Sequence, residues 1–93
     1  MDIFQVLLSK KAEKSLEKLP SYIAIKLLSW VDAVQHQGLR EVRKIPGYHD
    51  EPLKGDRFGE RSIRLSKAYR AIYLVKKDGI EFVEIMEVNK HAY

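Results

Sequence analysis

An Asp-Gly pair at positions 78–79 lies between two runs of residues that have strand composition. Asp-Gly is a favoured pair for a two-residue hairpin turn, because both turn positions require positive φ. The pair therefore predicts that two antiparallel strands, over 69–76 and 80–88, lie side by side. The second run carries apolar residues on both faces, which is typical of an interior strand. Residues 61–66 alternate between apolar and polar side chains and predict a third strand before these two.

The N-terminal part of the chain changes from strand composition to helical periodicity. Residues 4–8 are apolar and short enough for a strand. Ser9 is a preferred N-cap residue, and apolar residues at helical spacing predict a helix over 10–19. Pro20 cannot continue that helix, so a second helix with a broad apolar stripe follows it and ends at Gly38. The two helices are predicted to form a helical hairpin.

The predicted elements follow the order β-α-α-β-β-β. We expect Tyr22 and Trp30 of the second helix to pack against the sheet. Residues 39–59 contain several glycines and prolines and are predicted to be irregular, apart from a short helical turn near 40–44. There is no internal repeat or domain boundary, so residues 1–93 are expected to form a single α+β domain. In it, two N-terminal helices pack on one curved, mainly antiparallel sheet.

Composition excludes several classes of protein. The chain has no cysteine, which removes disulfides, thiolate metal sites and a cysteine nucleophile. No apolar run approaches the roughly 20 residues that span a bilayer, and the N-terminal residues lack the order of a secretion signal. We therefore expect a cytoplasmic protein without membrane contact. The net charge is +4, and between Lys54 and Lys77 only Asp56 and Glu60 are acidic. Such a segment favours a polyanionic partner, although an ordinary solvated surface can have the same composition.

Residues that could support metal or phosphate-loop chemistry do not cluster. The histidines at 36, 49 and 91 lack the spacing of a zinc site, and the carboxylates are not grouped as magnesium requires. Gly55 and Gly59 lack the surroundings of a phosphate-binding loop. We therefore expect neither a metal ion nor another cofactor.

The remaining chemistry suits the cleavage of RNA. RNA carries its own nucleophile, the 2′-hydroxyl, so the protein needs only a proton acceptor, a proton donor and cations for the transition state. Arg70, followed by His91 and Tyr93 near the end of the chain, could supply these groups. A structural interpretation is also open, in which Arg70 is an ion-pair partner within the sheet and the last residues are a frayed end.

Four segments together resemble the RelE/HigB family of toxins from bacterial type II toxin–antitoxin systems. They are Leu53-Lys54-Gly55-Asp56-Arg57, Ser62-Ile63-Arg64-Leu65, Tyr69-Arg70-Ala71-Ile72-Tyr73 and Val88-Asn89-Lys90-His91-Ala92-Tyr93. The resemblance implies a microbial-RNase-like sheet in a RelE/ParE-like fold. It also implies a metal-independent endoribonuclease that cuts messenger RNA in the ribosomal A site, leaves a 2′,3′-cyclic phosphate, and is neutralised by a cognate antitoxin protein.

The resemblance also assigns roles to individual residues. Lys54 matches a lysine of the active-site loop, Arg70 matches an arginine that holds the scissile phosphate, and His91 and Tyr93 match C-terminal acid–base and base-stacking residues. Chains with this ending usually carry a polar or acidic residue at the position of Ala92, so we expect reduced activity here. The basic residues assigned only to RNA or ribosome contact are Arg57, Arg61, Arg64, Lys67 and Lys90.

Two alternatives belong to other functional classes. ParE toxins share the fold and inhibit DNA gyrase without cutting RNA, and a plain RNA-binding module would need no catalytic groups. The set formed by Lys54, Arg70, His91 and Tyr93 favours the nuclease.

Overall fold

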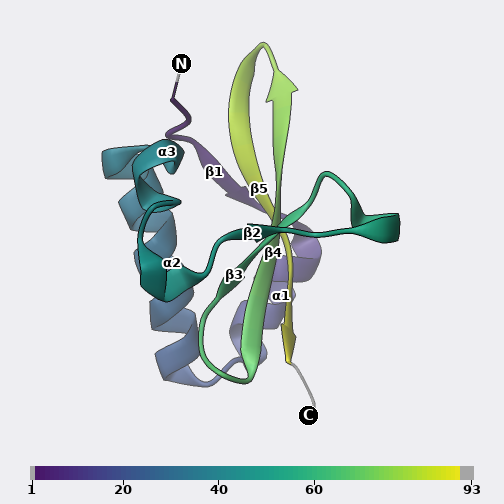
Figure 1. The fold of residues 1–93 in the computed structure, drawn as a ribbon. Coiled ribbons are helices and arrows are strands. Elements are labelled where there is room, and N and C mark those ends of the chain that lie inside the picture. The colour runs from purple at the N-terminus through teal and green to yellow at the C-terminus, as the bar shows by residue number, and fades with distance from the viewer. Residues whose placement is uncertain (1, 91–93) are drawn as a thin grey trace.

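A computed structural model describes residues 2–90 of the chain and shows helices packed on one mixed five-stranded sheet (Figure 1). The strands lie in the order β1-β5-β4-β3-β2, with β1 parallel to β5 and every other pair antiparallel. The elements are β1 (Val6–Leu8), α1 (Lys10–Lys18), α2 (Ser21–Gln37), α3 (Leu39–Val42), β2 (Glu51–Pro52), β3 (Arg61–Arg64), β4 (Tyr69–Asp78) and β5 (Ile80–Lys90), with short 3₁₀ helices η1 (Pro46–Tyr48) and η2 (Gly55–Arg57).

The predicted α+β order is confirmed, and the local signals act as expected. The Ser9 hydroxyl accepts a hydrogen bond from the Ala12 amide (3.0 Å) and so caps α1. Gly79, with φ +76°, forms the turn between β4 and β5. Strand β5 lies between β1 and β4, as its apolar residues on both faces predicted. The short helical turn predicted near 40–44 is present as α3.

The core lies between the helices and one face of the sheet. It contains Trp30, whose ring centroid is 5.1 Å from that of Tyr73 on β4. The prediction for Tyr22 is wrong, because this side chain is 66% exposed. Ile25 and Leu28 of the same helix are also exposed, so the buried stripe of α2 is narrower than its apolar pattern. A helix of this length carries more apolar positions than one face of a small sheet can cover.

A shift in register changes which residues of β5 point away from the helices. Ile72 is paired with Glu87, but the next residue of β4, Tyr73, is paired with Ile85, so Met86 has no partner on β4. The Met86 carbonyl accepts a hydrogen bond from the Ser9 hydroxyl (2.7 Å). The extra residue reverses the alternation of side chains along β5. Before Met86 the even-numbered residues of β5 face away from the core, and after it the odd-numbered residues do.

The irregular segment before β3 adds an edge strand that the sequence did not predict. Glu51 and Pro52 form β2 and pair with Ser62 and Arg61. His49, just before this strand, has a left-handed backbone with φ 44°. No helix within residues 2–90 has the length and hydropathy needed to cross a bilayer.

Candidate active site

The sheet face turned away from the helices carries a row of polar side chains across three strands. Arg70 in the middle strand, β4, is paired with Arg64 of β3 and with Asn89 of β5. Directly paired residues project to the same face, so the side chains of Arg64 and Arg70 start from adjacent positions on this face. Like charges placed opposite each other repel, and an anion bound between them would relieve that repulsion. The alternation predicted for residues 61–66 is observed, because Ile63 is buried in the core while Arg64 projects from the other face, where it is paired with Arg70.

A cavity of about 500 Å³ opens on this face around Arg70. Ile72, only 5% exposed, forms an apolar part of its wall. The lining residues are Glu51, Leu53, Arg57, Ser62, Arg70, Ile72 and Asn89. The cavity thus combines cations, a carboxylate and an amide on the edge of the sheet that β2 forms.

Two neighbours hold the Arg70 guanidinium. Its Nη1 donates to the Ser62 hydroxyl (3.2 Å) and lies 3.4 Å from a carboxylate oxygen of Glu51. Ser62 is buried, whereas the side chain of Glu51 is 59% exposed. The contact with Glu51 is an exposed ion pair of small net energy, so an incoming phosphate can replace it. The sequence did not indicate Glu51 or Ser62 as site residues, because their proximity to Arg70 depends on the pairing of β2 with β3.

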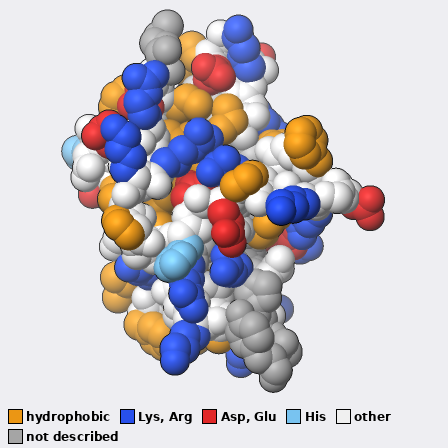
Figure 2. All heavy atoms as spheres, viewed as in Figure 1, with side chains coloured by type: hydrophobic (Ala, Val, Ile, Leu, Met, Phe, Trp, Pro, Cys, Tyr) orange, Lys and Arg blue, Asp and Glu red, His pale blue; other side chains and the backbone are white. Residues whose placement is uncertain are grey.

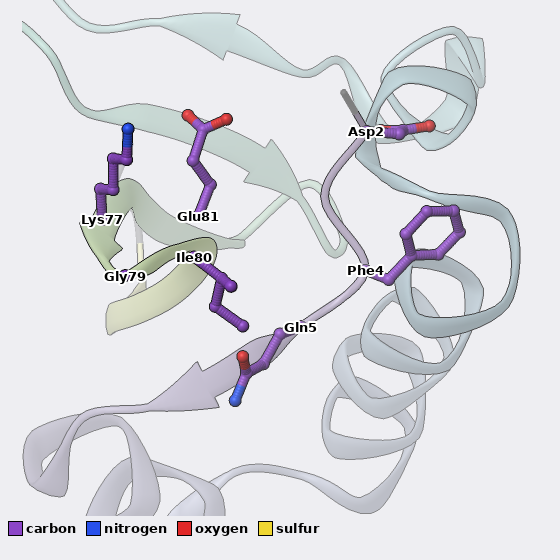
Figure 3. A pocket seen from close by; sticks show the side chains of 7 residues that line it. All are labelled: Asp2, Phe4, Gln5, Lys77, Gly79, Ile80 and Glu81. Carbon is purple, nitrogen blue, oxygen red and sulfur yellow. The ribbon is translucent and has the colours of Figure 1, made fainter.

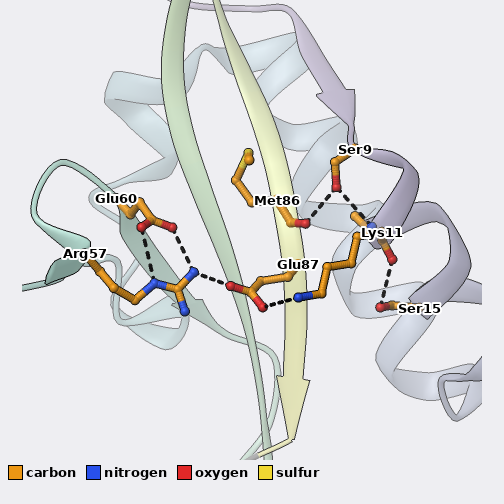
Figure 4. A network of polar contacts seen from close by, with 8 residues as sticks. Ser9, Lys11, Ser15, Arg57, Glu60, Met86 and Glu87 are labelled. Carbon is orange, nitrogen blue, oxygen red and sulfur yellow. Dashed lines mark hydrogen bonds and ion pairs between the residues drawn. The ribbon is translucent and has the colours of Figure 1, made fainter.

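A chain of ion pairs fixes the loop beside the cavity (Figure 4). Arg57 binds both carboxylate oxygens of Glu60 (2.9 and 3.2 Å) and also contacts Glu87 of β5. Glu87 in turn accepts a bond from Lys11 of α1 (3.2 Å). The hydrogen bond from Arg57 holds the pKa of Glu87 below its usual value, and the hydrogen bonds to Glu60 and Glu87 raise that of Arg57. Two carboxylates therefore share the charge of Arg57, which ties η2 to the sheet and to α1.

The structure does not bring all the predicted basic residues together. Lys54 and Lys67 are exposed in loops, and Lys54 does not line the cavity although its neighbour Leu53 does. Arg61 points to the helix-covered face, as its pairing with Tyr73 requires. Lys90 lies opposite Tyr69, with its ammonium 5.8 Å from the centre of that ring.

Arg61 is also bound to a buried acid on that face. Its Nε lies 2.6 Å from the carboxylate of Asp50, whose side chain is 1% exposed. Burial is the largest single influence on the pKa of Arg61 and lowers it, but the hydrogen bond and the charge of Asp50, together with Tyr73, outweigh burial and raise that pKa. Arg61 therefore does not belong to the group formed by Arg64 and Arg70.

His91 and Tyr93 lie outside the described residues, as does Ala92. Their predicted roles therefore stay predictions. Asn89 is the last described residue that lines the cavity, and it lies two positions before His91.

Lys and Arg side chains predominate along the middle and lower part of the face seen in Figure 2, with single acidic side chains between them. This view is the one of Figure 1, in which β2 crosses the front of the sheet. Within residues 2–90, no three histidine or carboxylate side chains converge as ligands for a metal ion.

A separate hollow of about 370 Å³ lies at the other end of β4 and β5 (Figure 3). Phe4 and Gln5 of the N-terminal segment border it on one side, and Ile80 and Glu81 of the hairpin border it on the other. None of the predicted site residues contributes to this hollow. Its surface is mostly apolar, and its charged lining residues are Asp2, Lys77 and Glu81.

Comparison with known proteins identifies a family and a set of similar folds. The family model described as the ParE toxin of the type II toxin–antitoxin system, parDE, matches residues 6–92. No curated protein sequence matches the chain.

Solved structures of toxins share the fold at low sequence identity. YafQ from Escherichia coli strain BL21(DE3) superposes with a TM-score of 0.73 at 15% identity, covering 94% of this chain and 92% of its own. The archaeal RelE–RelB complex from Pyrococcus horikoshii OT3 gives 0.68 at 24% identity, with coverages of 97% and 96%. A YoeB/ParE toxin from Agrobacterium tumefaciens gives 0.68 at 20% identity, with coverages of 95% and 99%.

Proposed function

The chain belongs to the ParE toxin family and is a toxin of a type II toxin–antitoxin system, and we propose that it is an endoribonuclease that cuts messenger RNA on the ribosome. Its partners are then a cognate antitoxin protein, the mRNA and the ribosomal A site. We take residues 1–93 as one toxin domain that acts in the cytoplasm without a metal ion or another cofactor.

The arrangement around Arg70 carries this proposal. A guanidinium offers two parallel donors to a phosphate, and Arg64 adds a second positive charge beside it. Donors that are already in place where negative charge develops are a large source of catalysis. The contact with buried Ser62 orients Arg70, and the contact with Glu51 is weak enough to be exchanged for the scissile phosphate.

The reaction is an internal transfer at phosphorus. The 2′-oxygen forms a bond to the adjacent phosphorus while the bond from phosphorus to the 5′-oxygen of the next nucleotide breaks. The products are a 2′,3′-cyclic phosphate and a free 5′-hydroxyl. Glu51, whose carboxylate lies 3.4 Å from the Arg70 guanidinium before the phosphate displaces it, is proposed to accept the 2′-proton. His91 is proposed to donate the proton to the leaving oxygen, and Tyr93 to stack on a base.

Lys54 is proposed to add positive charge from its loop beside the cavity, and Lys67 and Lys90 to contact RNA or ribosomal phosphates at the margins. Arg57 lines the cavity but is shared between two carboxylates, so its contribution is to shape the site. Few groups for proton transfer are present, so positioning of the mRNA by the ribosome must supply much of the rate. Naked RNA should therefore be cut slowly.

A gyrase inhibitor is the second candidate, because the family model is that of the ParE toxin. Primer extension on mRNA after induction separates the two, since only the nuclease leaves cuts in phase with codons. A supercoiling assay with purified gyrase is the converse test.

Arg70→Ala should reduce single-turnover cleavage on programmed ribosomes by about 10²–10³-fold, the usual loss for one preorganised donor. Arg70→Lys should recover little of that rate, because the planar pair of donors is lost. Lys67→Ala is the control and should mainly weaken binding and its salt dependence. Cleavage at the parental rate by folded Arg70→Ala would mean that Arg70 is structural.

A further inference from the structure

A second hollow, here called the Arg43 groove, lies on the other side of β2 from the Arg70 cavity. Its volume is about 300 Å³. It is lined by Arg43, Pro52, Leu53, Phe58, Gly59, Glu60, Arg61 and Val75. Leu53 lines both hollows, so they meet at the edge of the sheet that β2 forms. A strand bound at Arg70 can continue around this edge.

Arg43 is the cation of the groove whose charge is not neutralised by a described carboxylate. It directly follows α3 and is exposed, and its Nε makes a long hydrogen bond (3.4 Å) to the Tyr73 hydroxyl. That hydroxyl donates to Asp50 (2.5 Å), and Asp50 is also bound by Arg61. Within residues 2–90 no carboxylate forms an ion pair with Arg43, so the two terminal nitrogens of its guanidinium can bind an anion.

Neither Glu60, the acid that lines the groove, nor Asp50 behind it is left to pair with Arg43, and Asp2 and Glu81 line a separate hollow on another side of Arg43 without an ion pair to it. Asp50 is buried, and its two carboxylate oxygens accept hydrogen bonds from Tyr73 and Arg61. Both carboxylate oxygens of Glu60 are bound by Arg57. The groove therefore presents a positive field to a ligand.

Phe58 supplies an aromatic surface at the same place. Its side chain lines the groove and is 87% exposed, the highest value among the large apolar residues of the described chain. Leu53 and Val75 add an apolar wall. An exposed aromatic ring next to an arginine is the combination with which proteins hold single-stranded nucleic acid, because the ring stacks on a base and the cation binds a phosphate.

We propose that the Arg43 groove binds one nucleotide of the RNA strand that flanks the linkage held at Arg70. Arg43 binds its phosphate and Phe58 stacks on its base. This inference rests on the proposed nuclease function and extends the substrate from a single linkage to a segment that passes around the β2 edge. An acidic segment of a protein would also satisfy Arg43, but it would leave the ring of Phe58 without a stacking partner.

The test compares oligonucleotides of two lengths. RNA of three and of nine nucleotides, with 2′-O-methyl groups that block cleavage, is titrated against the purified protein, and fluorescence anisotropy is measured at several salt concentrations. We expect Phe58→Ala to weaken binding of the nine-mer about tenfold and Arg43→Gln to do the same. Arg43→Gln should also make binding less sensitive to salt. The slope of log affinity against log salt should become less negative by about 0.7, because one phosphate contact is lost. The three-mer, which fills only the Arg70 cavity, should bind all variants equally.

Tyr22→Ala is the matched control for Phe58, since Tyr22 is an exposed aromatic residue of α2 outside both hollows. Lys18→Gln serves the same purpose for Arg43. Phe58 buries almost no surface, so Phe58→Ala keeps the test valid even if Arg43→Gln is unstable.

Parental affinity of both variants for the nine-mer would overturn the inference, as would absence of binding by the parent. Weakened binding of the antitoxin with unchanged binding of RNA would also overturn it and assign the groove to the antitoxin. Codon-phased cleavage on ribosomes is measured separately. If ribosome-dependent cleavage is present while the groove variants bind RNA normally, only the inference about the Arg43 groove fails. If that cleavage is absent, the proposed nuclease function fails as well.

Discussion

Replacement of Asp50 by alanine should cause a larger loss of stability than loss of any exposed acid of this protein. The Asp50 side chain is 1% exposed and makes two short bonds, to Arg61 (2.6 Å) and to the Tyr73 hydroxyl (2.5 Å). Removing one partner of a buried ion pair leaves the other charge uncompensated and costs about 3–5 kcal/mol. Arg61 retains a quarter of its side-chain exposure, so water can reach its guanidinium and the lower end of that range applies. We expect a loss of about 3 kcal/mol for Asp50→Ala.

Two further variants, Tyr73→Phe and the double variant with Asp50→Ala, show how much of this loss of unfolding free energy comes from the bond to Tyr73. Tyr73→Phe removes only the hydroxyl and leaves one carboxylate oxygen without its donor, which should cost about 1.5–3 kcal/mol. Because Asp50→Ala and Tyr73→Phe remove the same hydrogen bond, the double variant should be less destabilised than the sum, with a coupling energy of about 1–2 kcal/mol. Asp56→Ala, at an exposed position of η2, is the control and should change stability by at most about 0.5 kcal/mol.

Urea unfolding followed by tryptophan fluorescence is the assay. Trp30 is the only tryptophan and packs against Tyr73, so its emission reports the core beside this network. A domain of this kind is stable by about 5–15 kcal/mol, so a loss of 3 kcal/mol moves the midpoint clearly. The reasoning is refuted if Asp50→Ala unfolds at the same midpoint as Asp56→Ala.

Three other outcomes follow from single contacts. Burial, reinforced by the hydrogen bond to Asp50, raises the pKa of Tyr73 in the folded protein. As the pH rises, the unfolded chain therefore loses the Tyr73 proton before the folded chain does, and stability should fall above about pH 10. Unfolding measured from pH 9 to 11 should show a steeper loss for the parent than for Tyr73→Phe, and equal slopes would contradict the assignment. The Arg57 hydrogen bond lowers the pKa of Glu87, so its stabilisation is present above the ordinary value of about 4.5 and is lost as the pH falls below it. Glu87→Gln should therefore flatten the acid limb of a stability profile between pH 5 and 2, and an unchanged limb would exclude Glu87 as its source. Gly38 has φ +90°, and a Cβ there would clash with a carboxylate oxygen of Asp2. Gly38→Ala should lower stability by about 1–3 kcal/mol, and Asp2→Ala in the same chain should restore only part, because the backbone strain remains. Complete restoration would show that the clash alone matters.

The elements that the sequence predicted are those with local causes. The hairpin at Gly79 and the Ser9 cap depend on neighbouring residues, and both occur where expected. The turn itself differs from the two-residue form, because Asp78 belongs to β4 and pairs with Ile80, and only Gly79 has a positive φ. The edge strand β2 was not predicted, because two residues that include Pro52 show no periodicity. Its position comes from pairing with β3, which is a tertiary contact.

The same distinction applies to the site. Arg64 and Arg70 could be placed on one face by alternation, and alternation also assigns Arg61 to the face of Ile63. The charge of Arg61 suggested a surface role, but a buried acid from a distant loop binds it. Glu51 could not be found from sequence, since an isolated carboxylate in an irregular segment is ordinary and only the fold brings it to Arg70.

The position of β5 in the sheet has a consequence for how the chain folds during synthesis. Among the described strands β5 comes last in the sequence, yet it lies between β1 and β4, and the bond from Ser9 to Met86 joins residues 77 positions apart. A nascent chain that ends at Asp78 can pair β4 with β3, but β1 has no strand beside it and the core lacks Val83 and Ile85. Contacts of such long range slow folding relative to helical proteins of equal length. The sheet is therefore completed only after β5 leaves the ribosome, so the fold of this chain forms late in its synthesis.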